Sequence, residues 1–188
     1  MSRLLSGHGY HQVRLFELMR IDFADDLPPP VWPPDIDVRA LREEDTAELY
    51  AAHREAFLDH WGAGEETEED FRHYELGSPR FDPSLWLVAW SGGEAVGYVG
   101  ADAESEEDST RGHVNVLGVR RAYRKRGLGE ALLRQAFCEL RARGKRGCDL
   151  YVDAESPTGA TRLYERLGMT RHPRFATWEK ELRPAGDV

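Results

Sequence analysis

Apolar residues recur at every fourth position in the second half of the chain, along a stretch that begins beside a pair of glycines. The residues are Leu128, Leu132, Ala136 and Leu140, with Leu133 and Phe137 beside them. This spacing predicts an amphipathic helix over 127–143 with one buried face. A mostly apolar segment at 112–119 precedes the glycines and predicts a strand, so the order is strand, glycine-containing turn and helix.

The same patterns predict elements elsewhere in the chain. Strands are expected at 36–39, 85–90, 94–103 and 148–153, with a final strand pair around 169–182. Helices are expected after a capping box at Asp45–Glu48, over 68–76, and over 157–167, where Ser156 is the N-cap and Gly168 the C-terminal glycine. Five prolines within 24–35 exclude regular structure there and predict a linker.

The segment before the linker weakly repeats the pattern near the C-terminus. Residues 9–21 align with residues 168–180 at an offset of 159, with a glycine and a phenylalanine at matching positions. Because a lone strand has unpaired backbone groups, we expect it to add to this domain's sheet or to that of a partner chain, the latter forming a homodimer. The predicted boundaries are an N-terminal extension at 1–23, the linker at 24–35, one domain at 36–183 and a tail at 184–188.

Length and composition narrow the class of protein. The 188 residues are 40% hydrophobic and 31% charged, which suits one globular domain with its own core. No apolar run approaches the roughly 20 residues of a membrane helix, and the N-terminal residues lack the pattern of a signal peptide. Two cysteines, Cys138 and Cys148, make no disulfide framework and favour a reducing, cytoplasmic location.

The net charge of −9 is unevenly distributed along the chain. Residues 120–146 contain ten Lys or Arg against two Glu, a local charge of +8, so the rest of the chain carries −17. A basic segment in an acidic protein favours one anionic ligand over a nucleic-acid surface. The cations from Arg134 onward fit the exposed face and last turn of a helix, whereas those at 120–126 precede its N-terminus, where an anion would balance them.

The turn between this strand and helix has the residue types of a pyrophosphate site. Arg124, Lys125 and Arg126 supply positive charge, while Gly127 and Gly129 lack the Cβ atoms that would keep a phosphate from the backbone. The first turn of the helix has N–H groups without intrahelical partners. A glycine-rich turn also occurs as plain chain reversal, so the motif alone is weak.

The motif gains specificity from the elements that follow it. After the strand at 148–153 comes a helix carrying Leu163-Tyr164-x-x-x-Gly168-Met169, and the constellation over 113–169 resembles the acyl-CoA-dependent GNAT N-acetyltransferase superfamily. The resemblance implies an α/β fold of the α+β type. Its sheet would be mixed and mostly antiparallel, with about six or seven strands and about four helices, splayed at the cofactor strand. Tandem proteins occur in this superfamily, so residues 8–22 are interpreted as a remnant of an upstream domain.

The resemblance also implies acetyl-CoA as co-substrate and assigns residues to it. The backbone of Leu117, Gly118 and Val119 is expected to pair with the pantetheine arm, and an amide near Leu117 or Gly118 to stabilise the oxyanion. The residues expected at the pyrophosphate are Arg124, Lys125, Arg126, Gly127, Leu128 and Gly129. Ser156 stands where the family commonly has an asparagine that touches the cofactor, and it keeps one hydrogen bond available. An ordinary interior strand would instead have every backbone group paired within the protein.

Proton transfer is assigned in the same way. Tyr164 is expected to protonate the departing thiolate, because a phenol pKa of about 10 lies above that of a thiol, about 8.5. Its helical spacing fits core packing as well. The group that takes the proton of the amine stays open between His113, Asn115 as a water holder, and the acids at 102–108, which also fit a solvated loop.

The acceptor side is the least clearly marked. Phe57, His60 and Trp61 lie where the family's early helices line the acceptor pocket, and Glu104 with its neighbouring acids is expected to attract a cationic substrate. The seven histidines show no metal-ligand spacing, so no metal is predicted. A P-loop or dinucleotide site is excluded because the Gly-Lys-Ser/Thr and Gly-x-Gly-x-x-Gly patterns are missing.

The predicted function is therefore an acyltransferase reaction. An N-acetyltransferase would move the acetyl group of acetyl-CoA directly to the primary amine of a small molecule or an amino terminus, with no nucleic-acid or membrane partner. An aminoglycoside-type antibiotic acetyltransferase is a second alternative, favoured if acidic side chains line the acceptor pocket. A non-catalytic CoA-binding regulatory domain is the third, since an anion-binding turn alone does not distinguish binding from turnover.

Overall fold

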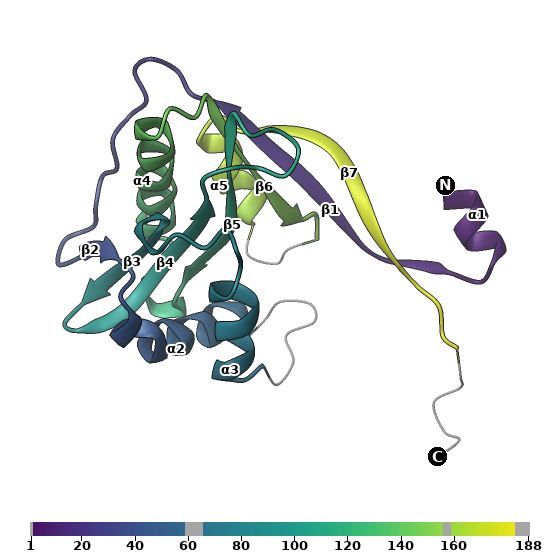
Figure 1. Ribbon diagram of the computed structural model, residues 1–188, viewed down its shortest axis with the longest axis horizontal. Coiled ribbons are helices and arrows are strands. Elements are labelled where there is room, and N and C mark those ends of the chain that lie inside the picture. The colour runs from purple at the N-terminus through teal and green to yellow at the C-terminus, as the bar shows by residue number, and fades with distance from the viewer. Residues whose placement is uncertain (1, 59–65, 156–158, 183–188) are drawn as a thin grey trace.

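The strands form one seven-stranded sheet in the order β2-β3-β4-β5-β6-β1-β7 (Figure 1). A computed structural model describes residues 2–58, 66–155 and 159–182. The strands are β1 (His11–Asp22), β2 (Asp37–Ala40), β3 (Trp86–Ser91), β4 (Glu94–Asp102), β5 (Arg111–Val119), β6 (Gly147–Asp153) and β7 (Thr170–Glu179). All neighbours are antiparallel except β5 and β6, which are parallel. This mixed, mostly antiparallel sheet confirms the predicted fold class.

Helices accompany the sheet within the described residues. They are α1 (Ser2–Gly7), α2 (Thr46–Phe57), α3 (Glu68–Phe71), α4 (Leu128–Ala142) and α5 (Ala160–Arg166). Short 3-10 turns lie at Glu43–Asp45, Pro83–Leu85 and Arg121–Tyr123, and a π-helical turn, Arg72–Leu76, extends α3. The helix expected over 157–167 is observed from Ala160, after Gly159 in a left-handed conformation, and Ser156 lies outside the described residues.

Helices cover both faces of the sheet and divide its core into two apolar clusters. On one face α4 packs through Leu132, Leu133, Phe137 and Leu140 against Val99, Val114 and Leu150. On the other face α2 and α3 pack through Leu49, Ala52 and Phe71 against Trp86, Val88 and Tyr98. The predicted apolar face of the 127–143 helix is thus the buried one. The central strands are covered on both sides, as their nearly continuous apolar residues require.

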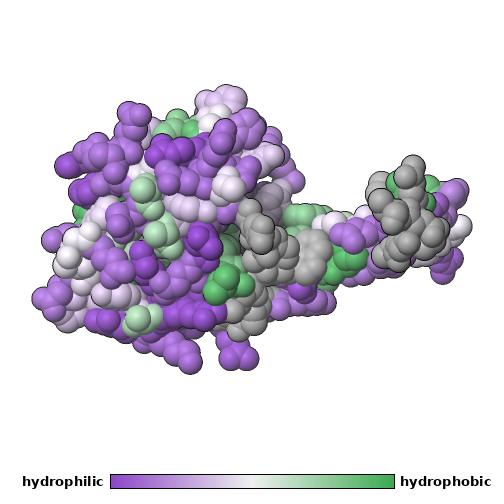
Figure 2. All heavy atoms as spheres, turned by 90° about the horizontal axis from the view of Figure 1, so that it is seen from below, coloured by the Kyte–Doolittle hydropathy of each residue, from purple (hydrophilic) through white to green (hydrophobic). Residues whose placement is uncertain are grey.

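β1 lies between β6 and β7, far from its neighbours in sequence. It pairs with β6 from Phe16↔Asp153 to Asp22↔Gly147, and with β7 from His11↔Glu179 to Arg20↔Thr170. The first residues of β1 pair only with β7 in the described structure. There the two strands form an arm that extends from the rest of the domain (Figures 1 and 2). The predicted strand pair around 169–182 is wrong, because β7 is a single strand whose partner is β1.

The predicted capping box at the start of α2 does not form either. The Asp45 carboxylate accepts hydrogen bonds from the Arg39 guanidinium and, at 3.1 Å, from the Arg42 amide, and no side chain caps α2. The bonds from Arg39 hold the pKa of Asp45 below its usual value in spite of burial. An arginine of the neighbouring strand therefore takes the carboxylate that local sequence assigns to the helix.

Candidate active site

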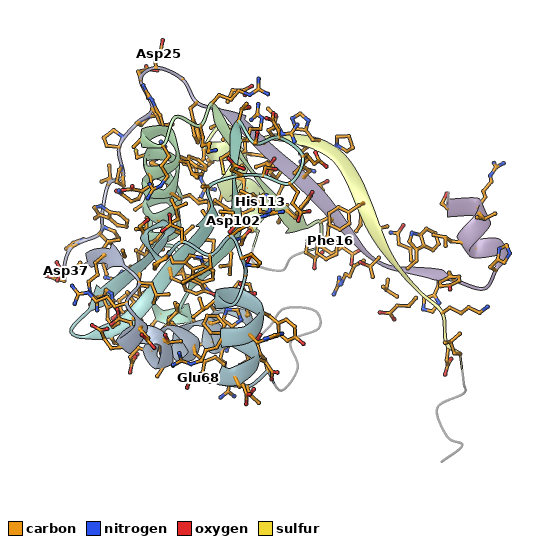
Figure 3. The ribbon with its side chains drawn as sticks, in the orientation of Figure 1. Phe16, Asp25, Asp37, Glu68, Asp102 and His113 are labelled. Atoms are coloured by element: carbon orange, nitrogen blue, oxygen red, sulfur yellow. The ribbon has the colours of Figure 1, made fainter. Side chains whose placement is uncertain are left out.

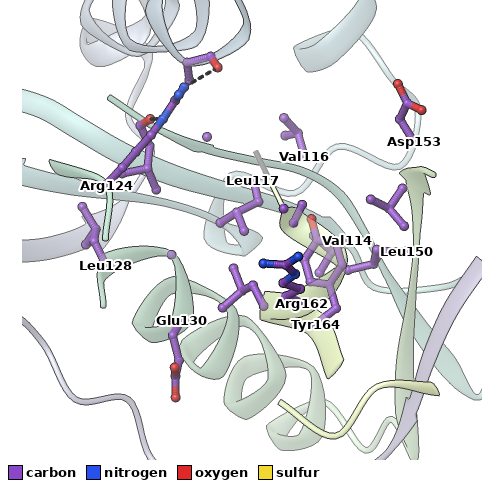
Figure 4. Close-up of a pocket in the computed structure, with 18 of the residues that line it drawn as sticks. Val114, Val116, Leu117, Arg124, Leu128, Glu130, Leu150, Asp153, Arg162 and Tyr164 are labelled. Atoms are coloured by element: carbon purple, nitrogen blue, oxygen red, sulfur yellow. Dashed lines mark hydrogen bonds between the residues drawn. The ribbon is translucent and has the colours of Figure 1, made fainter. Parts of the chain in front are cut away.

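β5 and β6 separate partway along their length and leave a cavity between them. They pair from Arg111↔Gly147 to Val114↔Leu150 only. Beyond that point β5 continues beside β4, while β6 continues beside β1. The resulting cavity has a volume of about 700 Å3 and is lined by residues of β5, β6, α4 and α5 (Figure 4). The predicted splay at the cofactor strand is confirmed as part of the fold.

The part of β5 beside the cavity has backbone groups available for a ligand. The pairing with β4 shifts register after Gly100↔Val116, so Asn115 is an extra residue of β5, and it is exposed in the cavity wall. The Arg120 amide, just after β5, donates to the Val96 carbonyl of β4 at 3.0 Å. This bond shows that the backbone groups of Arg120 face β4. Because strand residues alternate, Leu117 and Val119 direct their backbone groups toward the gap, where the Val119 carbonyl accepts from Arg124 and its amide stays available.

A close packing contact fixes Gly118 on the other side of β5. A Cβ atom at this position would lie 2.4 Å from Cε1 of Tyr98, whose side chain is fully buried beneath α2. Glycine is therefore required for β5 to pass over the Tyr98 ring. Since Gly118 faces β4 by the same alternation, Leu117 is the better of the two predicted oxyanion donors.

The turn before α4 exposes the amides of the first helical turn. Lys125 and Gly127 both have left-handed backbones, with φ of 60° and 85°, and Gly127 is the N-cap of α4 without a side-chain cap. The first intrahelical bond runs from the Ala131 amide to the Gly127 carbonyl at 3.0 Å. The amides of 128–130 thus have no intrahelical partner, and these residues line the cavity. This geometry suits an anion.

The three basic residues of the turn have different positions. The Arg124 guanidinium donates to the carbonyls of Val119 at 3.1 Å and Ala56 at 2.8 Å, so it joins the turn to β5 and α2 (Figure 4). Lys125 lines the cavity. The Arg126 guanidinium lies 5.0 Å from the centre of the Tyr123 ring and is not part of the cavity wall. Arg124 and Lys125 of the turn therefore line the cavity, together with Arg162 and Arg166 from α5.

Tyr164 extends from α5 into the cavity. Its side chain is 8% exposed, and its hydroxyl makes no hydrogen bond with the described residues (Figure 4). Burial raises the pKa of Tyr164 to about 12. The phenol therefore stays protonated and has a proton to donate into the cavity.

His113 lies at the point where β5 and β6 separate. Its Nδ1 is 2.6 Å from Oδ1 of Asp149, a buried residue of β6. Burial acts to raise the pKa of Asp149, but hydrogen bonds from His113 and Ser105 and the charge of Arg20 outweigh it and lower that pKa. The pair combines an imidazole with an ionised carboxylate. His113 itself is not part of the cavity wall, but it precedes the lining residues Val114 and Asn115, and its ring lies 5.2 Å from that of Tyr151, which is.

The residues predicted for the acceptor side do not all meet at the cavity. Phe57 lines it and stacks on His53 at 4.7 Å between ring centres. Glu104 is mostly exposed and pairs with Lys145 Nζ at 3.1 Å, and it does not line the cavity, so its assignment to the acceptor site is not supported by its position. His60 and Trp61 lie outside the described residues.

The structure adds site residues that the sequence did not indicate. Phe16, Tyr151 and Asp153 form the cavity wall on the side of β1 and β6. A hydrogen-bonded chain outside the cavity wall runs from the Tyr98 hydroxyl to His53 Nδ1 at 2.5 Å, and from His53 Nε2 to the partly exposed Glu66 at 3.1 Å.

No group of three or more His, Cys, Asp or Glu side chains in the described ranges has the arrangement of a metal site. Of the helices in this same part of the chain, none has the length and apolar character to cross a membrane.

Comparison with known proteins connects the cavity to a family. The acetyltransferase (GNAT) family profile matches residues 46–169. A mycothiol acetyltransferase of Thermobispora bispora is 37% identical over 175 residues, covering 90% of this chain and 58% of that protein. One of Streptomyces scabiei is 36% identical, covering 92% and 53%. The chain thus spans little more than half the length of these relatives. The crystal structure of a GCN5-related N-acetyltransferase from Sphaerobacter thermophilus superposes with a TM-score of 0.81 and 37% identity, covering 100% of this chain and 57% of that chain.

Proposed function

This chain belongs to the acetyltransferase (GNAT) family, and on that basis we propose that it transfers the acetyl group of acetyl-CoA directly to a primary amine. One observation carries the proposal. A single cavity brings together the free backbone edge of β5, the exposed amides at the start of α4 and the Tyr164 hydroxyl. These are the groups needed to hold an amide-containing arm, a pyrophosphate and a leaving thiolate.

The residues present fit acetyl-CoA bound in one orientation, with its pyrophosphate at the start of α4 and its pantetheine arm along β5. The pyrophosphate is placed at the amides of Leu128 and Gly129 beside Lys125, and the pantetheine amides along Leu117 and Val119. Arg124 holds the turn in the required shape through its bonds to the Val119 and Ala56 carbonyls. Acetyl-CoA supplies the activated acyl group, and the protein orients it.

Direct transfer then needs three contributions from the chain. The amine nitrogen bonds to the thioester carbon, and the Leu117 amide stabilises the oxygen as it becomes negative. The carbon–sulfur bond breaks, and Tyr164 gives its proton to the departing thiolate. We propose that His113, next to the cavity wall, takes the proton released by the amine nitrogen through a water held by Asn115, which lines the cavity.

The acceptor we propose is a small molecule. The relatives named mycothiol acetyltransferase make a mycothiol-type amine the first acceptor to test. Two acids line the described cavity, Glu130 and Asp153, and Glu130 pairs with Arg134 at 3.0 Å. So few acidic side chains do not favour a polycationic aminoglycoside.

We place the transferase domain at residues 36–183 and propose that the extension at 1–23 is part of its working structure. Its strand, β1, supplies Phe16 to the cavity wall. We retain the proposal that this segment derives from an upstream domain.

The proposal is tested by measuring release of free CoA thiol from acetyl-CoA with a panel of amines. The panel contains a mycothiol-type amine, amino acids, peptides with free amino termini, polyamines and aminoglycosides. Acceptor-dependent thiol release that is much slower in Tyr164→Phe is the expected result. Tight CoA binding without thiol release for any amine would replace the transferase with a non-catalytic CoA-binding domain.

A further inference from the structure

Three adjacent strands bring a histidine, an aspartate and an arginine side by side. His113 of β5 is the register partner of Asp149 of β6, which is in turn the partner of Arg20 of β1. On the opposite side His113 is the register partner of Asp102 of β4, which lies near it in Figure 3. Directly opposed residues share a face of the sheet, so these side chains lie next to one another.

Both oxygens of the Asp149 carboxylate are engaged. Oδ1 contacts His113 Nδ1 at 2.6 Å. Oδ2 accepts from Ser105 Oγ at 2.9 Å and from Arg20 Nη2 at 3.3 Å. With 1% of the residue exposed, water cannot replace these donors. The carboxylate is therefore held in one orientation by three elements of the fold.

The charge of this carboxylate decides which nitrogen of His113 carries the proton. The donors around Asp149 lower its pKa despite burial, so it is ionised at neutral pH. An ionised carboxylate only accepts hydrogen bonds, so Nδ1 of His113 must be the donor. Neutral His113 then has its lone pair on Nε2, which has no hydrogen-bond partner in the part of the chain that the structure describes.

We propose that Asp149, fixed by Arg20 of the N-terminal strand and by Ser105, is a positioning residue that keeps Nε2 of His113 ready to accept the proton of the acceptor amine. This inference rests on the proposed function. As the amine nitrogen bonds to the acetyl carbon, its N–H bond breaks and a proton bonds to Nε2. The imidazolium formed is stabilised by the carboxylate on its other side and returns the proton to solvent.

Other charged and titratable groups surround His113. Asp102 faces it from β4, and the ring of Tyr151 of β6 lies 5.2 Å away between centroids. Arg20 also bonds to Glu107 at 3.3 Å, so its charge is shared between two acids. Glu75, in the turn after α3, lies close enough to Asp102 for its pKa to be raised by that acid, by Glu66 and above all by burial. These neighbours are unchanged in Asp149→Asn and so cancel in its comparison with the wild type.

The first measurement reads the tautomer without using activity. Nitrogen-15 spectra of the imidazoles are recorded across neutral pH, with His113→Gln identifying the His113 signal. We expect the neutral form of His113 to carry its proton on Nδ1. In Asp149→Asn the carboxamide N–H can donate to Nδ1, and the proton should move to Nε2. A wild-type His113 protonated on Nε2 would overturn the inference and leave the transferase proposal standing.

The second measurement reads the consequence for turnover. Asp149→Asn should lower kcat by about 100-fold or more, as loss of a positioned proton acceptor does, with unchanged affinity for CoA. Its kcat/KM profile against pH should differ from that of the wild type, since the charge beside the proton acceptor is removed. Arg20→Met and Ser105→Ala each remove one support and should give smaller changes of the same kind, which covers the case in which Asp149→Asn fails to fold.

Asp45→Asn is the matched control. It also removes a buried carboxylate bonded to an arginine, but away from the cavity, so it should lower stability and leave the pH profile in place. A wild-type profile and kcat in folded Asp149→Asn would overturn the inference. Absence of thiol release by the wild-type protein with every amine would instead overturn the proposed function, and the role of His113 with it.

Discussion

Substitution of Gly129 by alanine should change stability and cofactor affinity in opposite directions. A Cβ atom there would lie 3.5 Å from Leu163 Cδ2, 3.7 Å from Val119 Cγ2 and 3.9 Å from Leu117 Cδ2, which are ordinary contact distances. Gly129→Ala therefore introduces no clash. Alanine in place of glycine within a helix stabilises by about 0.5–1 kcal/mol, or about 1–4 °C in Tm for a chain of this size. The variant should be slightly more stable than the wild type.

Cofactor binding should respond in the opposite direction. The added methyl group would occupy the cavity at the exposed amides of the first turn of α4, where the pyrophosphate is placed. Loss of one hydrogen bond to a charged group costs about 1.5–3 kcal/mol. The Kd for CoA should therefore rise by about 10- to 150-fold.

The two effects are read by calorimetric titration with CoA and by thermal unfolding of the free protein. Gly7→Ala is the control, because Gly7 ends α1, has open space around its Cβ position and lies away from the cavity. It should leave the Kd unchanged. Unaltered CoA affinity in a folded Gly129→Ala protein would refute the placement of the pyrophosphate at this helix.

The remaining predictions concern one proton donor, one structural cation and one pH dependence. Tyr164→Phe should lower kcat by about 100-fold or more with unchanged KM for acetyl-CoA and unchanged Tm, because the hydroxyl has no described partner; a parallel loss of CoA binding would assign Tyr164 to packing. Arg124→Met should lower the free energy of unfolding in urea by about 1.5–3 kcal/mol, because the carbonyls of Val119 and Ala56 lose a charged donor; an unchanged midpoint would show that Arg124 does not hold the turn. The Asp45 pKa is lowered in the folded protein, so its contribution to stability is complete above the unfolded value of about 3.9 and is lost as the pH falls through the folded value. The free energy of unfolding should thus fall more steeply between about pH 5 and 3 in the wild type than in Asp45→Asn, and equal slopes would contradict the pairing with Arg39.

Sequence reasoning succeeded where the information is local. The repeat of Leu128, Leu132, Ala136 and Leu140 located α4 to within a residue at each end, because a helix in contact with a sheet needs one apolar face. The glycines before the helix located the exposed amides, because a left-handed residue and a missing side-chain cap are properties of the turn itself.

It failed where partners come from distant parts of the chain. The Asp45 carboxylate bonds to Arg39 of another element, Glu104 pairs with Lys145, and the Arg124 guanidinium donates to the Ala56 carbonyl of α2. No periodicity marks such contacts, since they depend on how strands and helices are brought together. Asp149 shows the limit most clearly, because its three partners come from β1, β5 and the loop between β4 and β5.

The place of β1 in the sheet has a consequence for how the chain folds. β1 pairs with the two strands that come last in sequence among those described, at separations of more than a hundred residues, so this edge of the sheet cannot close until β7 is present. The register also sets His11 beside Glu179, so a tight turn joining the two would make β7 and β1 a local hairpin. A circular permutant opened within residues 24–35 should reach the same sheet with lower contact order, and it should fold faster than the natural order of the chain.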